Sequence, residues 1–436
     1  MKEIGINKED RYTELANNLK LMGKYDEAVE YYRKALEVDG DNFEAYANLG
    51  DLLDKTNKWE EACEVYGKAI ELQPENEVIL NERGNMFFKL QKYPEALKCY
   101  SKAIYFNYKF VVPYHNKGLV YEIFSEFDQA MKCYKLSIDI DPNYKEAYVS
   151  KARLEKKLGK YEDALETYNK LENLEKNNNK ILLDMIKINI DMKNYKEALS
   201  EVEKLIKIYP EESSGYYIKG VLVNYLGKSE ESLKFINKAL RLDTKNPKIY
   251  YEKALIYSNI KKYDKALEFL EETISIDPDY YEAYILRIDI LMKTGKYSEA
   301  VYYCRTLINR DNTKMYSAYG KAPYRMYLAY KAMGKKKDAD EICKYAIKYY
   351  DEIIELSGFV PEFYVIKGIL LTHFDRYNEA KECYDYALAL DSKYAEAYYY
   401  RSKYYEAQGM NLEAEKDMKK CVELDKSYES YEENIN

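Results

Sequence analysis

Residues that could transfer protons or bind a metal are scarce in this chain of 436 residues, which contains only two histidines. His115 and His373 stand in opposite halves of the sequence. Neighbouring residues therefore cannot supply an HExxH pair, a zinc set of Cys and His, or a Ser-His-Asp triad. We expect both histidines to be solvated surface residues, and we predict no metal site.

A second candidate for chemistry is Gly227-Lys228-Ser229, which is similar to the end of a phosphate-binding loop. That motif requires a glycine five residues before Gly227, and Leu222 stands there instead. The Gly-Lys pair also recurs at multiples of 34 residues, at Gly23-Lys24, Gly159-Lys160 and Gly295-Lys296. We interpret it as a turn between two helices.

Acidic pairs such as Glu60-Glu61 and Glu271-Glu272 are frequent, but their pattern predicts exposed helix positions. No apolar surroundings are expected to raise the pKa of one carboxyl, as general acid catalysis requires. We therefore predict that the protein is not an enzyme and that it needs no cofactor.

The secondary structure that positions these residues follows a sequence repeat of fixed length. Small residues stand at intervals of 34 residues without an insertion, at Ala28, Ala62, Ala96, Ala130, Ala164, Ala198, Ser232, Ala266 and Ala300. A period of this size indicates one small unit stacked many times, with each unit burying its apolar face against its neighbours.

Each unit is predicted to contain two helices. In the first unit, Tyr12, Leu15, Ala16 and Leu19 form one helical stripe, a turn follows at 23–25, and Ala28, Tyr32 and Ala35 form a second stripe. Helices of this length are marginal alone in water, so packing must stabilise them.

The second unit carries the fullest pattern, with Tyr46, Leu49, Gly50, Leu53, Trp59, Ala62, Tyr66, Ala69 and Pro74. This pattern resembles the tetratricopeptide repeat family. The resemblance implies an all-α fold, an α-solenoid in which antiparallel helix pairs form a right-handed superhelix. We predict twelve repeats: nine contiguous ones at 9–314, a tenth at 320–353, and two more at 361–428. Residues 1–8 and 429–436 are predicted to flank the array.

Two insertions, at 315–319 and 354–360, interrupt the array around the tenth repeat. A longer second helix from about Lys337 to Leu356 would accommodate the second insertion, and the segment from Arg310 to Ala322 would project as a loop. We expect a kink at this point.

The eighth position of each repeat is usually small, with Ala16, Gly50, Gly84, Gly118, Ala152, Gly220, Ala254 and Gly368. Glycine in a helix costs about 1 kcal/mol relative to alanine, which close helix contact would offset. Ile186, Ile288 and Tyr327 are large residues at this position, so we expect the helices of repeats six, nine and ten to be splayed or shifted.

Composition narrows the class of partner and the compartment. The net charge is −8, which argues against nonspecific nucleic-acid binding. The chain has no apolar run long enough to span a membrane, and the charged segment Met1–Asp10 is not typical of a secretory signal. Seven cysteines lie in second helices, at spacings too long for disulfides between neighbouring repeats. We predict reduced, mostly buried cysteines and a cytoplasmic location.

The resemblance implies that a second stripe on each first helix, at repeat positions 2, 5, 6, 9 and 12, lines a concave groove that binds extended peptides. In repeats one to four this stripe contains Asn17, Asn48, Asn81, Asn85 and Asn116 among acidic residues. An amide side chain can match a peptide backbone unit, because it is both a donor and an acceptor. Alternatively, these asparagines are only typical of the family.

The stripe then changes its chemistry twice. Repeats five and six present Arg153, Lys156, Lys157, Lys180 and Lys187, which would suit an acidic segment or a terminal carboxylate, or would be ordinary lysine-rich surface. From repeat seven onward it is apolar, with Tyr217, Tyr251, Tyr324 and Ile366 among its members. Apolar surface of this extent marks a partner site unless neighbouring first helices bury it.

Two functions follow from these observations. The first is a non-catalytic scaffold, an adaptor or co-chaperone-like protein, that binds an extended peptide segment of a protein partner in the groove. The alternative is a structural protein that assembles into homo-oligomers through its last repeat, where the outer side near Met418, Cys421 and Leu424 lacks a full capping helix.

Overall fold

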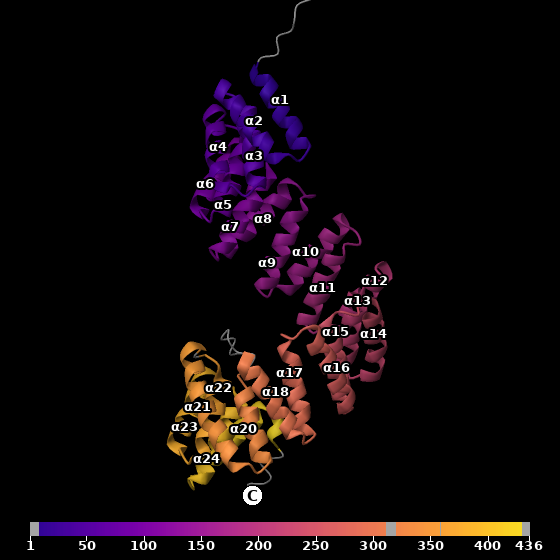
Figure 1. The fold of residues 1–436 in the computed structure, drawn as a ribbon, viewed down its shortest axis with the longest axis vertical. Helices are drawn as coiled ribbons and strands as arrows, with labels where there is room; N and C mark the ends of the chain where they lie inside the picture. The colour runs from indigo at the N-terminus through magenta and orange to yellow at the C-terminus, as the bar shows by residue number, and fades with distance from the viewer. Residues whose placement is uncertain (1–7, 311–319, 358, 430–436) are drawn as a thin grey trace, which may run out of the picture. The chain divides into compact units, whose positions relative to one another are not determined.

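The computed structural model describes residues 8–310, 320–357 and 359–429, and these residues form helices and turns without any strand. They fall into two compact units, 1–209 and 210–436, which are described separately. The predicted all-α solenoid is confirmed. Figure 1 shows helix pairs following one another along the chain in each unit.

The first unit contains six helix pairs: α1 (Lys8–Leu21), α2 (Tyr25–Val38), α3 (Phe43–Lys55), α4 (Trp59–Leu72), α5 (Glu77–Lys89), α6 (Tyr93–Phe106), α7 (Val111–Ile123), α8 (Phe127–Ile140), α9 (Lys145–Lys157), α10 (Tyr161–Leu174), α11 (Asn179–Asp191) and α12 (Tyr195–Ile208).

The described part of the second unit contains six more pairs, followed by a short 3₁₀ helix: α13 (Ser213–Tyr225), α14 (Ser229–Leu242), α15 (Pro247–Asn259), α16 (Tyr263–Ile276), α17 (Tyr281–Lys293), α18 (Tyr297–Arg310), α20 (Ala322–Ala332), α21 (Lys336–Ser357), α22 (Pro361–Thr372), α23 (Tyr377–Leu390), α24 (Ala395–Ala407), α25 (Asn411–Leu424) and η1 (Lys426–Tyr428).

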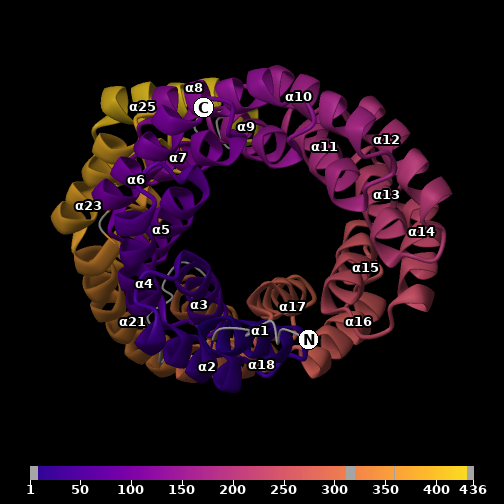
Figure 2. The same cartoon turned by 90° about the horizontal axis from the view of Figure 1, so that it is seen from above.

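Within each unit the helices are arranged in two layers. Each first helix packs against the second helix of its own pair and against the helices of adjacent pairs. Several consecutive first helices, such as α5 and α7, also touch directly. In the first unit, Figure 2 shows the first helices along one side of the array and the second helices along the other. The layer of first helices therefore presents the stripe that the sequence assigns to a groove.

The turn between the helices of a pair requires one residue with a positive φ. Gly23 has φ 75°, and the next amide, that of Lys24, donates to the carbonyl of Leu19 at 2.9 Å. In six pairs this position is not glycine and still has φ near 60°: Asn57, Gln91, Ser125, Lys193, Lys261 and Asp375. The packing of the two helices holds these turns in a conformation that such residues seldom adopt.

Glycine at the eighth position makes room for a large side chain from the second helix of the same repeat. A Cβ atom added to Gly50 would lie 2.4 Å from the ring of Tyr66, and one added to Gly84 would lie 2.5 Å from the ring of Tyr100. The same relation holds for Gly118 with Tyr134, Gly220 with Ile236 and Gly368 with Tyr384. Close helix contact therefore accounts for these glycines.

Where the eighth position is large, the residue at the matching second-helix position is small. Ile186, Ile288 and Tyr327 are all buried, and Val202, Cys304 and Cys343 stand where six other repeats have tyrosine and the remaining three have isoleucine, leucine or methionine. The backbones of these three helix pairs also approach each other closely at fewer places than those of the other pairs. This agrees with the expected splaying and shows that smaller partners accompany it.

The second insertion lengthens a helix, as expected. Helix α21 has 22 residues and runs from Lys336 to Ser357. The first insertion, at 315–319, and most of the expected projecting loop lie outside the described residues.

The seven cysteines are free and buried. Burial raises the pKa of every one of these thiols, to about 11 for Cys99, Cys383 and Cys421 and to about 12 for Cys304 and Cys343. The expectation of buried, unpaired cysteines is confirmed for the folded chain.

We expect these thiols to react with Ellman's reagent at least about tenfold more slowly in the native protein than in urea near pH 8, because the thiolate is both scarce and inaccessible. Absorbance of the released thiol product measures both rates. Rapid labelling of even one cysteine in the native protein would contradict this.

Candidate functional site

Tyrosines of the second helices reach through the first unit to the stripe on the first helices. The Tyr66 hydroxyl donates to Asp51 at 2.9 Å, and the Tyr100 hydroxyl donates to Asn85 at 2.9 Å. The equivalent hydroxyls of Tyr32, Tyr134 and Tyr168 donate to Asn17, Glu122 and Asp184. Each tyrosine thus fixes the orientation of one polar side chain on the stripe.

The asparagines of the stripe are bonded to one another. The amide of Asn116 donates to the side-chain oxygens of Asn81 at 3.1 Å and Asn85 at 3.0 Å, and that of Asn48 donates to Asn17 at 3.4 Å. Asn81 is only 1% exposed, so a ligand cannot reach it. The asparagines therefore form two hydrogen-bonded groups, Asn17 with Asn48 and Asn116 with Asn81 and Asn85, in which every member except Asn81 is partly exposed.

Lys20 belongs to the group of Asn17 and Asn48, although sequence reasoning did not select it. Its ammonium group donates to Asn48 at 2.8 Å and lies 3.2 Å from a carboxylate oxygen of Asp51. The signal was present, because Lys20 stands at position 12 of the first repeat, on the stripe itself.

Of the five residues in the predicted basic stretch, some are held by neighbouring side chains and others are exposed. Lys156 is paired with Asp191 at 3.0 Å, and the Lys157 ammonium lies 4.7 Å from the centre of the Phe127 ring at the start of α8. Lys157 is thus held against an aromatic ring of the preceding repeat. Arg153, Lys180 and Lys187 are exposed, with Arg153 3.5 Å from Glu122. Among the described residues, Lys180 and Lys187 on α11 form no ion pair, and Arg153 on α9 is exposed despite its pair with Glu122.

The apolar stripe of the second unit is partly covered. Tyr217, Tyr251 and Tyr324 are half-buried, and Tyr324 stacks on Tyr327 with ring centres 6.3 Å apart. Ile366 is 4% exposed and belongs to the hydrophobic core, so its selection as a groove residue is wrong. The surrounding core residues cover Ile366, in agreement with the alternative that neighbouring helices bury this part of the stripe.

Neither histidine is the solvated surface residue that the sequence suggested. His115 is buried, its Nε2 is 2.9 Å from the Ser150 hydroxyl, and burial lowers its pKa. His373 is partly buried, with Nδ1 3.2 Å from the Tyr327 hydroxyl and Nε2 2.7 Å from Asp340. Their hydrogen bonds run between neighbouring repeats, so both act in packing.

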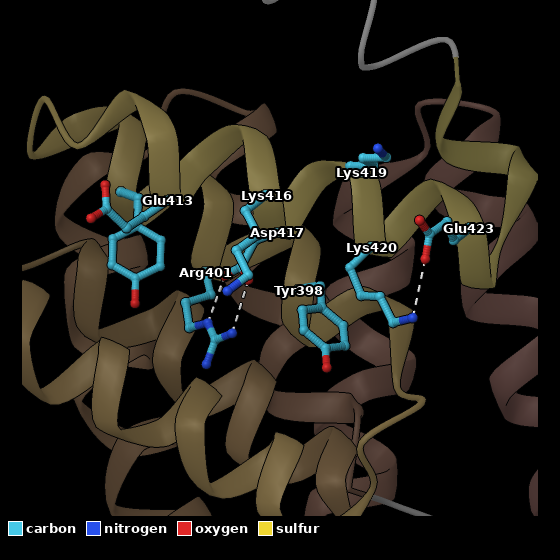
Figure 3. A pocket seen from close by; sticks show the side chains of 9 residues that line it. Tyr398, Arg401, Glu413, Lys416, Asp417, Lys419, Lys420 and Glu423 are labelled. Atoms are coloured by element: carbon cyan, nitrogen blue, oxygen red, sulfur yellow. Dashed lines mark hydrogen bonds and ion pairs between the residues drawn. The ribbon is translucent and has the colours of Figure 1, made fainter.

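A pocket of about 630 Å³ lies between α24 and α25, as Figure 3 shows. Its deepest cation, Arg401, is bound through Nε and Nη2 to Asp417 at 2.6 and 2.9 Å and through Nη1 to Asp385 at 2.6 Å. Lys420 pairs with Glu423 at 3.1 Å. The inner charges of the pocket therefore neutralise one another, and the other charged residues that line it, Glu413, Lys416 and Lys419, are exposed surface side chains.

The three apolar side chains selected on the last repeat are covered, although Leu412 of the same repeat is exposed. Met418 and Cys421 are 1% and 0% exposed, and Leu424 is half-buried. Tyr428 of η1 folds back on Tyr399, with ring centres 5.1 Å apart. The residues selected for assembly therefore form no exposed apolar patch.

The described residues contain no group of three or more His, Cys, Asp and Glu side chains arranged to hold a metal ion. None of the helices they form is both long and apolar enough to cross a membrane.

The stacked helix pairs and the polar layer of first helices define an α-solenoid of short helix-turn-helix repeats. Models of the tetratricopeptide repeat match residues 11–75, 78–107, 113–144, 145–178, 247–280 and 395–428. The chain belongs to the tetratricopeptide repeat family. Members of this family bind protein or peptide partners, and their repeats are generally non-catalytic scaffolds.

Several solved structures have a similar fold. Tom70 of yeast is 18% identical with a TM-score of 0.47, and the match covers 98% of this chain and 94% of Tom70. MamA is 24% identical with a TM-score of 0.36, covering 38% of this chain and 91% of MamA. The pilF protein of Pseudomonas aeruginosa is 24% identical with a TM-score of 0.40, covering 46% and 92%. No curated protein matches the sequence.

Proposed function

We propose that the protein is a scaffold that binds an extended, acidic segment of a partner protein along the first helices of its first unit. The observation that carries this proposal is the cluster of three exposed cations, Arg153, Lys180 and Lys187, on the adjacent helices α9 and α11. Cations on neighbouring first helices can contact successive carboxylates of one extended chain.

The stripe asparagines supply the contacts that do not depend on partner sequence. The Asn85 oxygen accepts from Tyr100 and Asn116, and its amide nitrogen donates to Glu82 at 3.1 Å. An amide nitrogen has two hydrogens, so one remains for a peptide carbonyl. The tyrosine below holds this amide in place before a partner arrives, which reduces the entropy lost on binding.

The net charge indicates the class of partner, and the free cysteines indicate the cellular compartment. A charge of −8 supports a protein partner rather than a nucleic acid, and buried thiols without disulfides suit the reducing cytoplasm. Assembly into homo-oligomers through the last repeat has less support, because Met418 and Cys421 are already buried.

We expect the double substitution Arg153→Glu and Lys187→Glu to raise the Kd for the partner at least about tenfold, since each change replaces an attraction by a repulsion at the same place. The partner is first captured from lysate and identified by mass spectrometry, and its affinity is then measured by calorimetry with the purified proteins.

The control is Lys160→Glu with Lys176→Glu, which makes the same change of charge at exposed positions outside the stripe. An equal loss of affinity in the control pair would show a general charge effect. Unchanged affinity in the first pair would remove the proposed role of α9 and α11.

A further inference from the structure

A buried carboxylate stands on the layer of first helices in the second unit. Glu252 of α15 is 7% exposed. Its carboxylate accepts a hydrogen bond of 3.3 Å from the side-chain amide of Asn224 on α13. Among the described residues no basic side chain forms an ion pair with it. Burial raises its pKa, although the Asn224 amide opposes the rise.

Three tyrosines surround this carboxylate. Tyr217 lies on α13, Tyr251 precedes Glu252 on α15, and Tyr280 stands just before α17. The rings of Tyr251 and Tyr280 are 5.2 Å apart. Burial and then the charge of Glu252 raise the pKa of Tyr217 to about 12, and the Glu252 charge also contributes at the other two phenols. The four side chains therefore form one cluster, which we call the Glu252 cluster.

The hydroxyls of the Glu252 cluster differ from those of the first unit. Tyr32, Tyr66, Tyr100, Tyr134 and Tyr168 each donate to a polar side chain. In the described structure, the hydroxyls of Tyr217, Tyr251 and Tyr280 have no hydrogen-bond partner within the chain, yet the rings are half-buried. These three hydroxyls are not among the fully buried polar atoms of the described structure, so a ligand can reach them and form hydrogen bonds with them.

The surrounding charge defines the sign of that ligand. Glu282, at the start of α17, adds a second negative charge beside Tyr251 and Tyr280. Arg325 of α20, a cation on the next first helix, is bound bidentately to Asp289 at 2.7 and 3.0 Å and so is already neutralised. Aromatic faces combined with an unpaired carboxylate favour a cation and exclude an anion.

We propose that the Glu252 cluster is a subsite for one cationic side chain, arginine or lysine, of an extended protein segment. The cation lies on the faces of Tyr251 and Tyr280 and pairs with Glu252, and the hydroxyls accept hydrogen bonds from it. This subsite rests on the proposed scaffold function, but it lies in the other unit and uses the opposite charge. The partner chain then carries a basic residue in addition to its acidic segment.

Stability provides a separate test of the cluster. The pKa of Glu252 is raised in the folded chain, so folding favours the protonated form and the ionised carboxylate costs stability near neutral pH. Glu252→Gln removes that charge and keeps the shape. We expect this variant to melt at the same temperature as the parent chain or higher, while it loses cation binding.

The experiment uses the full chain near pH 7 and two short peptides whose termini are capped and uncharged. One is the peptide acetyl-Ala-Ala-Arg-Ala-Ala-amide, and the other has citrulline, an uncharged isostere, in place of arginine. Saturation-transfer NMR titrations give both Kd values and show which peptide protons touch the protein. We expect the arginine peptide to bind at least about tenfold more tightly, with its side-chain methylenes most strongly saturated.

Glu252→Gln should abolish the preference for arginine without lowering the melting temperature. The matched control is Glu230→Gln on the exposed surface of α14, which removes the same charge and should keep the preference. Equal Kd values for the two peptides, or a preference that survives Glu252→Gln, would overturn the proposal.

The outcome separates the two proposals. If the affinity for the partner depends on Arg153 and Lys187 while the chain shows no preference for arginine over citrulline, the Glu252 cluster fails and the scaffold function stands. If the preference for arginine depends on Glu252 but Arg153 and Lys187 have no effect on partner affinity, the cluster stands and the acidic-segment site in the first unit fails.

Discussion

Replacing Gly84 by isoleucine should lower the free energy of unfolding of the first unit by about 3 kcal/mol, at the upper end of the range for overpacked cores. Even a Cβ atom at this position would lie 2.5 Å from the Tyr100 ring, which is itself 1% exposed and is held by its hydrogen bond to Asn85. Urea unfolding followed by circular dichroism measures the loss, and hydrogen exchange locates it in α5 and α6 and the adjacent pairs.

A second substitution should recover most of that loss. Gly84→Ile combined with Tyr100→Val reproduces the pair that repeat six already contains, Ile186 with Val202. Recovery should be incomplete, because the hydrogen bond from Tyr100 to Asn85 is gone. If the double variant were no more stable than Gly84→Ile alone, matched volume would not explain these positions.

Gly67 supplies the control for the Gly84 series. The atoms nearest to a Cβ added there belong to the guanidinium of Arg83, at 3.2 and 3.3 Å, and that side chain is flexible. Gly67→Ile should therefore cost far less than Gly84→Ile, although both change a helical glycine into the same β-branched residue.

Replacing Arg401 by methionine should cost about 3 kcal/mol in the last repeat, since removing one member of a buried ion pair leaves its partners charged and unpaired. The Asp417 side chain is 8% exposed and loses both of its bonds to the guanidinium. Asp385 keeps only Lys381, at 2.6 Å. Hydrogen exchange in α24 and α25, together with urea unfolding, measures the effect.

Lys420→Met is the comparison for Arg401, because its partner Glu423 is about half exposed and the pair is a surface contact. Exposed pairs of this kind contribute about 0.5 kcal/mol. Similar losses in the two variants would mean that the bonds of Arg401 to Asp385 and Asp417 do not stabilise the repeat.

The sequence predicted most of the fold because repeat positions have fixed environments. All eight alanines at the 34-residue spacing are fully buried, and the predicted helix from Lys337 to Leu356 differs from α21 by one residue at each end. Six turns with a positive φ were harder to read, since side chains as different as Lys193 and Asp375 occupy them. There, tertiary packing overrides local preference.

The groove was less predictable, because the burial of a first-helix side chain depends on the helix of the next repeat. Asn81 and Ile366 stand at stripe positions and are nevertheless buried, whereas Arg153 and Lys187 are exposed. Glu252 was missed because the stripe around it was considered only for its apolar members. Comparison with Ile218 and Leu286, which occupy the same position in the flanking repeats, would have marked it as an exception.

The matched glycine and tyrosine pairs also bear on how such a chain can change its length during evolution. Gly84 and Tyr100 belong to one repeat, so a recombination event that joins two chains between repeats transfers the pair intact. A crossover at the turn inside a repeat would instead combine helices of unmatched volume, such as that of Ile288 with that of Tyr100. Whole repeats are therefore the units that can be duplicated or lost without disturbing the packing inside them.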